Sequence, residues 1–225
     1  MAYALMTSGG KDATIALDRA RRTGLEVRFL TALYDAPSER VRFHGLRRQL
    51  LESQAAALGL QPIVAPMTGE RFETAFLDLL RDLRRRDVDG VIFGNVHLAD
   101  VRGWYEERVR DIGLDHIEPL WGDPPVEIAW EVVERGYRAL IISVHLDHPA
   151  VPYLGREFDA DVVTELSCVE RLDPCGERGE YHTFVFDGPD FAQPVGFVRG
   201  TTREAERHRY LDIIPLNGRP ATASL

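Results

Sequence analysis

Lysine, cysteine and long apolar runs are scarce or absent in this chain of 225 residues. Its two cysteines, Cys168 and Cys175, are too few for a disulfide framework, and their spacing is not the Cys-x-x-Cys of a zinc site. No segment approaches the roughly 18 apolar residues of a membrane helix, and the N-terminus lacks the basic region and apolar core of a signal peptide. We therefore expect a cytoplasmic protein without a membrane-embedded segment.

Positive charge is also scarce relative to negative charge. The chain has 27 lysine and arginine residues against 36 aspartate and glutamate residues, which gives a formal net charge of −9 at pH 7. This balance argues against a general nucleic-acid-binding surface, although a local basic patch would still be compatible with it. The hydrophobic content of 44% is that of a globular protein, and the length suits one large domain or a domain with a small appendage.

The only lysine of the chain, Lys11, lies in the run S-G-G-K-D at positions 8–12. The apolar run 3–6 predicts a buried strand before this loop, and apolar residues at helical spacing predict a helix from Asp12 onward. A strand, a glycine turn and a helix N-terminus together bind phosphate, because backbone N–H groups and the helix dipole face the anion. The run is not a Walker loop, since Leu5 stands where that motif requires glycine, and it is not the dinucleotide motif G-x-G-x-x-G.

A lone lysine at this position is informative by itself. A compact ammonium group on a flexible stem suits a phosphate loop, and the guanidinium group of arginine is a poor substitute. The alternative is that one lysine survived by chance on a surface turn. Asp12, beside it, offers the carboxylate oxygen that Mg²⁺ prefers next to phosphate oxygens. Lys11 and Asp12 are therefore candidates for phosphate and metal contacts.

Strands and helices alternate through the first two thirds of the chain. Such alternation predicts an α/β fold, with a parallel sheet covered by helices on both faces. The predicted strands are 3–6, 26–33, 62–65, 90–93 and 139–144, and the predicted helices begin at 12 or span 44–58, 70–86, 100–112 and 126–135.

The pattern changes after about residue 146, where Pro149, Pro152 and Gly155 mark a linker. We expect two domains, a main domain over 1–146 and a small C-terminal α+β lobe over 147–225 that closes one side of a cleft. The elements predicted in the lobe are a helix over 158–172, strands over 181–186, 195–202 and 208–214, and a frayed tail over 220–225.

Polar residues follow the second and fourth predicted strands, on the side where parallel sheets bind their ligands. His44 is a candidate there, although a histidine at a helix start is more often a surface or capping residue. Asp100 could equally cap the next helix. The substrate-binding candidates in these two loops are His44, Asn95, His97 and Asp100.

A second unusual stretch has the sequence D-P-C-G-E-R-G-E-Y-H-T-F-V at positions 173–185. A flexible acidic turn before a strand can orient an amine or ammonia, or help to hold a metal ion. A histidine beside it can accept a proton near neutral pH. The alternative is a β-turn with solvated acids. The candidates for catalysis in this turn are Glu177, Glu180 and His182.

Four motifs together carry a resemblance to a known family. The glycine loop resembles the S-G-G-x-D-S loop of the PP-loop, or N-type, ATP pyrophosphatases. Three further motifs make the chain similar to the diphthine–ammonia ligase family over about residues 3–215. They are V-I-F-G-N-V-H-L-A-D-V-R at 91–102, P-L-W-G at 119–122 and C-G-E-R-G-E-Y-H-T-F-V-F-D-G-P at 175–189.

The resemblance implies an adenine nucleotide α-hydrolase-like domain that binds ATP, followed by a C-terminal substrate lobe. It implies an ATP-dependent, amide-forming ligase with Mg²⁺. In that chemistry a carboxylate attacks the α-phosphorus of ATP, pyrophosphate leaves, and ammonia then displaces AMP. The partners would be ammonia and a carboxylate that is either a small molecule or carried on a protein. No glutaminase module is visible in the sequence, so we expect free ammonia as the nitrogen source.

With the resemblance, the candidate residues fall into three sets. Catalysis is assigned to Lys11, Asp12, Glu177, Glu180 and His182, with Asp12 also as the metal ligand. Nucleotide binding is assigned to Ser8, Gly9, Gly10, Lys11, Asp12, Leu33 and Gly94. Substrate binding is assigned to His44, Asn95, His97, Asp100, Gly176, Gly179 and Thr183.

Three positions depart from the family pattern. Ala13 replaces the usual serine of the loop, Asn95 stands where many members have aspartate, and His182 stands where eukaryotic and archaeal members often have glutamate. The histidine version resembles the bacterial branch of the family. Because bacteria lack diphthamide, we expect the chemistry to persist with a different acceptor.

Two other functional classes stay open. Sulfur insertion into tRNA also uses PP-loop adenylation, but it needs a basic surface and usually catalytic cysteines. The acidic balance and the positions of the two cysteines count against it. A non-catalytic nucleotide sensor gains some support from Ala13. Whether the chain forms a homodimer is also open.

Overall fold

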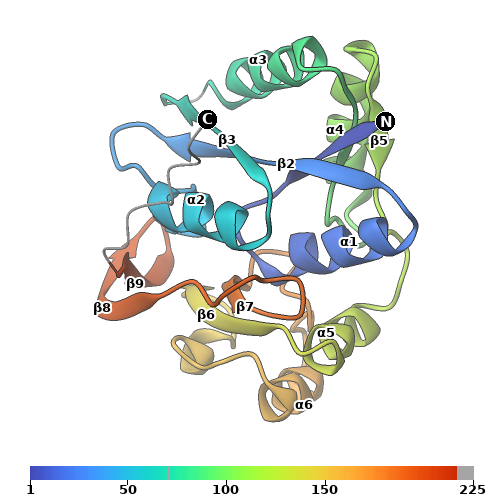
Figure 1. Ribbon diagram of the computed structural model, residues 1–225. Coiled ribbons are helices and arrows are strands. Elements are labelled where there is room, and N and C mark those ends of the chain that lie inside the picture. The colour runs from blue at the N-terminus through green and yellow to red at the C-terminus, as the bar shows by residue number, and fades with distance from the viewer. Residues whose placement is uncertain (70, 217–225) are drawn as a thin grey trace.

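The computed structural model describes residues 1–69 and 71–216, which form two sheets with helices between and around them (Figure 1). The predicted tail at 220–225 lies outside the described residues. None of the helices in these residues is long and apolar enough to cross a membrane. In chain order the elements are β1 (Ala2–Met6), α1 (Lys11–Arg22), β2 (Glu26–Asp35), α2 (Arg48–Ala57), β3 (Gln61–Met67), α3 (Phe72–Arg85), β4 (Val88–Ile92), α4 (Ala99–Asp111), β5 (Asp115–Ile117), α5 (Pro125–Glu134), β6 (Arg138–His145), the 3₁₀ helix η1 (Val151–Tyr153), α6 (Ala160–Cys168), β7 (Tyr181–Asp187), β8 (Phe197–Ala205) and β9 (His208–Pro215).

The first sheet is parallel, with the strand order β3-β2-β1-β4-β5. Its central strand β1 is almost wholly buried, as expected for a strand covered by helices on both faces. The chain moves outward from β1 to β3 and then returns to β4, on the other side of β1. The strand order therefore reverses between β1 and β4, which is where ligands of such sheets bind.

Helices cover both faces of the parallel sheet. On one face, α3 and α4 pack with the sheet in a core that contains Phe76, Leu80 and Val109. On the other face, α1 and α2 lie between the two sheets (Figure 1). The buried side of α1 carries Ile15 and Leu17, which join the core shared with the second sheet. This arrangement confirms the predicted α/β fold.

The second sheet is antiparallel, with the strand order β7-β6-β9-β8. The small C-terminal sheet and α6 confirm the predicted α+β character of this region, but the placement of 139–144 in the parallel sheet is wrong, because β6 pairs with β7 and β9. Leu140 of β6 packs in the core that contains residues of α2, whereas Ile141 packs in the core with α1, α5 and α6. A strand buried on both faces reads as one continuous apolar run in either sheet. The domain division after residue 146 stays a prediction.

Two helices differ from the predictions in their bounds, and one strand was not predicted. The helix expected from His44 begins at Arg48, because residues before it form a tight turn in which Gly45 has a φ of +68°. A Cβ at Gly45 would lie 2.5 Å from the Tyr210 ring, so only glycine fits there. The helix predicted over 158–172 is shorter, and the side chain of Asp159 caps its N-terminus at Val162 N. The three-residue strand β5 was not predicted.

Candidate active site

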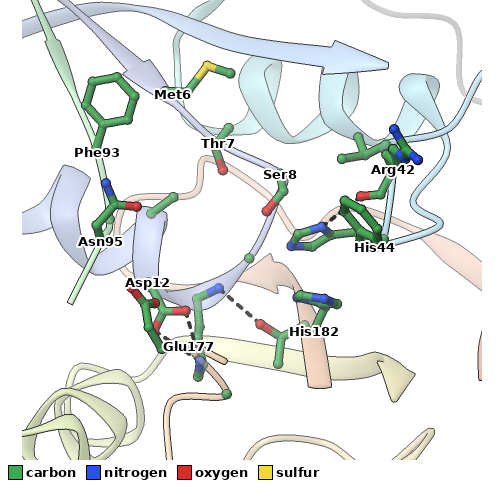
Figure 2. Close-up of a pocket in the computed structure, with 18 of the residues that line it drawn as sticks. Met6, Thr7, Ser8, Asp12, Arg42, His44, Phe93, Asn95, Glu177 and His182 are labelled. Carbon is green, nitrogen blue, oxygen red and sulfur yellow. Dashed lines mark hydrogen bonds and ion pairs between the residues drawn. The ribbon is translucent and has the colours of Figure 1, made fainter. Parts of the chain in front are cut away.

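A cavity of about 510 Å³ lies at the point where the strand order reverses. Its walls come from the loop after β1, the turn after β2, the loop after β4, and the turn before β7 together with the start of β7. Figure 2 shows labelled side chains from all four segments arranged around this space. The parallel sheet and the C-terminal sheet therefore build the site together.

The glycine loop gives α1 a start that faces the cavity. Gly9 has a φ of +90°, and a Cβ there would lie 2.6 Å from a methyl carbon of Leu46. Its N–H donates to Thr7 Oγ1 at 2.9 Å, and Gly10 is the N-cap residue of α1. Helix N-termini carry backbone N–H groups that attract anions. The predicted phosphate-binding geometry is therefore present, with Gly10 on the cavity wall and Gly9 behind it.

The C-terminal sheet fastens this loop. The N–H of Val185 donates to Gly9 O at 2.9 Å, and the side chain of Gln54 donates to both Gly9 O and Val185 O. Thr183 Oγ1 accepts a hydrogen bond from the backbone N–H of Lys11 at 3.1 Å. Thr183 therefore holds the first turn of α1, and strand β7 fixes the glycine loop through hydrogen bonds to Gly9 and Lys11.

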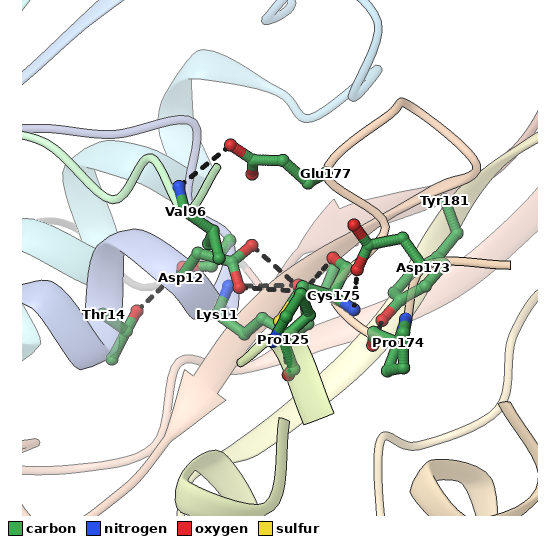
Figure 3. A network of polar contacts seen from close by, with 12 residues as sticks. Lys11, Asp12, Thr14, Val96, Pro125, Asp173, Pro174, Cys175, Glu177 and Tyr181 are labelled. Atoms are coloured by element: carbon green, nitrogen blue, oxygen red, sulfur yellow. Dashed lines mark hydrogen bonds and ion pairs between the residues drawn. The ribbon is translucent and has the colours of Figure 1, made fainter. Parts of the chain in front are cut away.

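Lys11 ties the loop to the acidic turn (Figure 3). Its side chain is 2% exposed, and its Nζ donates to both carboxylate oxygens of Asp12 at 3.0 Å and to Cys175 O at 2.5 Å. The ammonium group also lies 5.1 Å from the ring centre of Tyr181. Burial opposes the charged form, but the Asp12 carboxylate and the neighbouring groups outweigh it and raise the pKa of Lys11. Lys11 is therefore a buried cation at the base of the cavity.

The two glutamates of the acidic turn have different surroundings. Glu180 is fully buried, and its carboxylate accepts hydrogen bonds from the backbone N–H groups of Asp173 and Arg178 at 3.1 and 3.0 Å. It holds the turn together and does not line the cavity. Glu177 lines the cavity and accepts a hydrogen bond from Val96 N at 3.0 Å. Burial raises the pKa of Glu177 to about 7.

Glycines make this turn and its close packing feasible. Gly176 has a φ of +69°, and a Cβ there would lie 2.9 Å from the Tyr181 ring. Gly94, after β4, has no room for a Cβ either, since that atom would lie 2.6 Å from Ala13 N. Both glycines line the cavity. The backbone at Gly94 can therefore approach the first turn of α1 directly.

Asn95 lines the cavity next to Gly94, and its side-chain N–H donates to Glu118 Oε1 at 2.6 Å. Glu118 was not predicted from the sequence; its buried side chain lies 3.1 Å from Arg102 Nε and 3.3 Å from His116 Nε2. The carboxylate lies 23 residues from Asn95 in the sequence, so no local pattern could have connected them.

Two histidines form another part of the wall. The rings of His44 and His182 lie 4.0 Å apart between centroids, and both residues line the cavity. Burial lowers the pKa of His44 to about 4 and lowers that of His182 well below its ordinary value. Both imidazoles are therefore neutral at physiological pH, and His182 can act as a hydrogen-bonding group or a proton acceptor.

An apolar region forms the remaining wall. Leu33, at the end of β2, lies there as expected for a nucleotide contact. The other residues of this wall were not predicted, although aromatic residues at strand ends and at a helix start are a signal that the sequence contains. The apolar and aromatic residues of this wall are Met6, Leu33, Met67, Phe72, Phe93 and Tyr105.

Comparison with known proteins agrees with this geometry. A family model for the diphthamide synthase N-terminal domain matches residues 1–116, and a model for the C-terminal domain matches residues 124–214. The chain belongs to the diphthamide synthase family. It is 23% identical to the diphthine–ammonia ligase of Bos taurus and 24% identical to that of Homo sapiens, over 87% of this chain and 82% of either relative. A Schizosaccharomyces pombe diphthine–ammonia ligase is 28% identical over 52% of this chain and 21% of that protein.

Membership of the diphthamide synthase family makes this chain an ATP-dependent, amide-forming ligase. The predicted residues that line its cavity are Ser8, Gly10, Lys11, Asp12, Leu33, His44, Gly94, Asn95, Gly176, Glu177, His182 and Thr183. Five others lie elsewhere.

Each of these five residues has a different environment in the structure. Gly9 shapes the loop and Glu180 shapes the acidic turn, as described above. His97 Nε2 lies 2.5 Å from the Asp173 carboxylate, outside the cavity. Asp100 is exposed at the start of α4. Gly179 stands in the turn with a φ of +86°. The catalytic and binding roles assigned to all these residues stay predictions.

Proposed function

We propose that the chain binds ATP in this cavity, adenylates a carboxylate and transfers free ammonia to it. The observation that carries the proposal is the shared cavity. It brings the N-terminus of α1, which suits phosphate, against the acidic turn, which suits an amine. The relatives are named for diphthine as the acceptor, and the acceptor of this chain is a carboxylate whose identity is open.

The two ends of the cavity suit the two ends of ATP. The wall with Met67, Phe72 and Phe93 is apolar and aromatic, which suits the adenine ring. The loop at Ser8 and Gly10 is where the phosphates would lie. Backbone N–H groups at the helix N-terminus would stabilise the negative charge that grows on the departing pyrophosphate.

Asp12 is the residue that fits Mg²⁺. Its carboxylate is in the first turn of α1 and lines the cavity beside the phosphate loop. Among residues 1–69 and 71–216, no group of three or more His, Cys, Asp or Glu side chains converges to hold a metal ion. Magnesium commonly uses one or two carboxylates together with substrate phosphates, and a single carboxylate is consistent with that mode. The ion would neutralise phosphate charge.

The acceptor side is assigned to the turn after β2 and to β7. Arg42 lines the cavity there and makes no ion pair within the described part of the chain, so it is available to an acidic acceptor. Glu177 lies across the cavity with a pKa of about 7, near the value that suits a general base at neutral pH. His182, neutral beside His44, would be a second proton acceptor.

The two alternative classes are weaker. A tRNA-sulfurating enzyme needs a reactive thiol, whereas the Cys175 thiol donates to Pro125 O and burial raises its pKa. Cys168 is exposed on α6 and does not line the cavity. A nucleotide sensor would not need Glu177 in the cavity. The expected cytoplasmic location stays a prediction, and whether the chain forms a homodimer stays open.

The test is the product of ATP cleavage. The protein with Mg²⁺-ATP, ammonium and a panel of carboxylic acids should release AMP and pyrophosphate in equal amounts, with an amide as the second product. Release of ADP and orthophosphate would contradict the proposal. A cell extract serves as a second source of the unknown acceptor. If the protein binds ATP but forms no AMP with either the panel or the extract, the nucleotide-sensor alternative is favoured.

A further inference from the structure

The orientation of the Asn95 amide is fixed by chemistry. The side-chain nitrogen of Asn95 donates to Glu118 Oε1 at 2.6 Å, because an amide nitrogen only donates and a carboxylate oxygen accepts. The amide oxygen then points the other way, into the cavity, as Figure 2 shows for the labelled Asn95. Asn95 therefore presents a hydrogen-bond acceptor to any ligand at this corner.

The residues behind Asn95 keep that orientation. The side chain of Glu118 is 2% exposed, and its carboxylate lies 3.1 Å from Arg102 Nε and 3.3 Å from His116 Nε2. The Arg102 guanidinium lies 4.5 Å from the ring centre of Trp121. A buried carboxylate is unfavourable unless it is paired, so this network must remain assembled in the folded protein. The network therefore keeps the side-chain amide of Asn95 in one orientation, with its nitrogen toward Glu118.

The neighbouring polar side chains of the corner also present oxygen. Glu177 reaches the segment next to Asn95, where its carboxylate accepts from Val96 N. Asp12 belongs to the turn of α1 that packs against Gly94, and its carboxylate accepts from Lys11. The three side chains offer acceptors toward one corner of the cavity (Figure 2). A small ligand that only donates hydrogen bonds matches them best.

We propose that Asn95 Oδ1 and the Glu177 carboxylate form the ammonium-binding subsite of this ligase, with Glu118 as the positioning residue for Asn95. The proposal rests on the proposed function, because it places the nitrogen substrate of that reaction. Ammonium has four N–H donors and a positive charge, and it is small enough for a corner of the cavity. Glu180, which sequence analysis assigned to the ammonia side, takes no part, since both of its oxygens are used within the turn.

Two other ligands could in principle use the same oxygen. The amino group of adenine donates hydrogen bonds, and Mg²⁺ accepts oxygen ligands. The adenine amino group would make Asn95 a nucleotide contact, and loss of Asn95 would then weaken ATP binding. A metal ion would make the corner respond to Mg²⁺ and not to ammonium. Both ligands predict results that differ from those of an ammonium subsite.

The experiment uses ammonium chloride as the probe, with AMP bound to the full chain. The thermal unfolding midpoint is measured in ammonium chloride and in potassium chloride at matched ionic strength, because K⁺ has the charge of ammonium but no hydrogen-bond donors. The wild type should be stabilised by ammonium beyond potassium. Asn95→Leu, which keeps the shape and removes the acceptor, should weaken the apparent ammonium affinity about tenfold or more, the loss expected for one hydrogen bond to a charged group.

Glu118→Gln tests the positioning role. A glutamine can turn either end toward Asn95, so the amide is no longer held in one rotation, and ammonium affinity should fall nearly as far as in Asn95→Leu. The double variant should be no worse than Asn95→Leu alone, because Glu118 acts through Asn95. Additive losses would show a general structural effect and overturn the positioning role. Asp18→Asn is the matched control. Asp18 lies on α1 away from the cavity, and the substitution removes a buried carboxylate that is paired with Arg22 and Arg135.

ATP affinity and Mg²⁺ response are measured on the same preparations. Unchanged ATP affinity with lost ammonium preference supports the subsite. An equal loss of ATP affinity, a loss of Mg²⁺ response instead, or no ammonium preference in the wild type overturns it. A wild type that binds ATP without preferring ammonium refutes only this inference, whereas a wild type that fails to bind ATP refutes the proposed function itself.

Discussion

The two walls of the cavity are charged by different means. On the parallel-sheet side, the phosphate region is built from backbone N–H groups at Gly10 and the first turn of α1. On the C-terminal side, the charged groups are side chains of one turn, and Glu177 is the one that faces the cavity. The arrangement of the N–H groups on the first wall depends on the conformation of the glycine loop, and the raised pKa of Glu177 on the second wall depends on burial. Lys11 is bonded to both walls, to Asp12 and to Cys175 O.

A narrower comparison lies within the acidic turn. Glu177 and Glu180 are the same residue type, three positions apart, yet the first lines the cavity and the second binds two backbone N–H groups of its own turn. Motif membership therefore does not tell a carboxylate that lines the cavity from one that holds the turn together. The hydrogen-bond partners do.

The largest effect is expected where the two walls are joined. Lys11→Met leaves the Asp12 carboxylate without its ion partner and Cys175 O without its donor, so the free energy of unfolding should fall by about 3–5 kcal/mol. Urea unfolding at neutral pH measures this loss. Arg21→Met is a suitable control, because Arg21 is also on α1 but only part-buried. If Lys11→Met lost less free energy of unfolding than Arg21→Met, Lys11 would not hold the two walls together.

The second prediction separates the two glutamates. Glu180→Gln presents an N–H group where one of two backbone donors now binds a carboxylate oxygen, so the free energy of unfolding should fall by about 2 kcal/mol. Glu177→Gln should change stability less while it lowers amide formation. The rate of amide formation in the wild type should also rise with pH through about 7, as the Glu177 carboxyl loses its proton, and this rise should be absent in Glu177→Gln. Equal stability losses in both variants would contradict the division of roles.

Much of the fold could be predicted from sequence, because its signals are local. A strand, a glycine turn and a helix start identify the phosphate loop, and alternating strands and helices indicate the parallel sheet. The sheet that β6 joins could not be predicted, since its apolar run fits either sheet. Partners across long separations were equally inaccessible, such as Lys11 with Cys175 and Asn95 with Glu118. Residue identity selected the candidates, and only packing shows which face the cavity.

The third prediction concerns the neutral histidine pair. The pKa of His44 is about 4 in the folded protein against 6.5 for an unperturbed histidine, so between these values the unfolded state binds more protons. Stability from this group is complete above pH 6.5 and is lost as pH falls from 6.5 toward 4, with His182 acting in the same direction. About 1 kcal/mol should be lost by pH 5 after allowance for partial exposure. In His44→Gln, the free energy of unfolding measured in urea should fall less steeply with pH over this range. An unchanged pH dependence would mean that other groups cause the loss of stability.

The smallest effect on stability is expected at Arg42, where the acceptor side meets solvent. Arg42 is exposed and has no ion pair within residues 1–69 and 71–216, so Arg42→Gln should change the free energy of unfolding by no more than about 0.5 kcal/mol. Its effect should appear in function instead. Once a carboxylate that supports AMP release is found, the variant should raise the KM for that carboxylate several-fold while ATP affinity is kept, because a charged hydrogen-bond donor is lost. Arg199→Gln, an exposed arginine on β8 away from the cavity, should leave both constants as in the wild type. An unchanged KM in Arg42→Gln would show that the acceptor binds at another wall of the cavity. A loss of ATP affinity would show that Arg42 contacts the nucleotide instead.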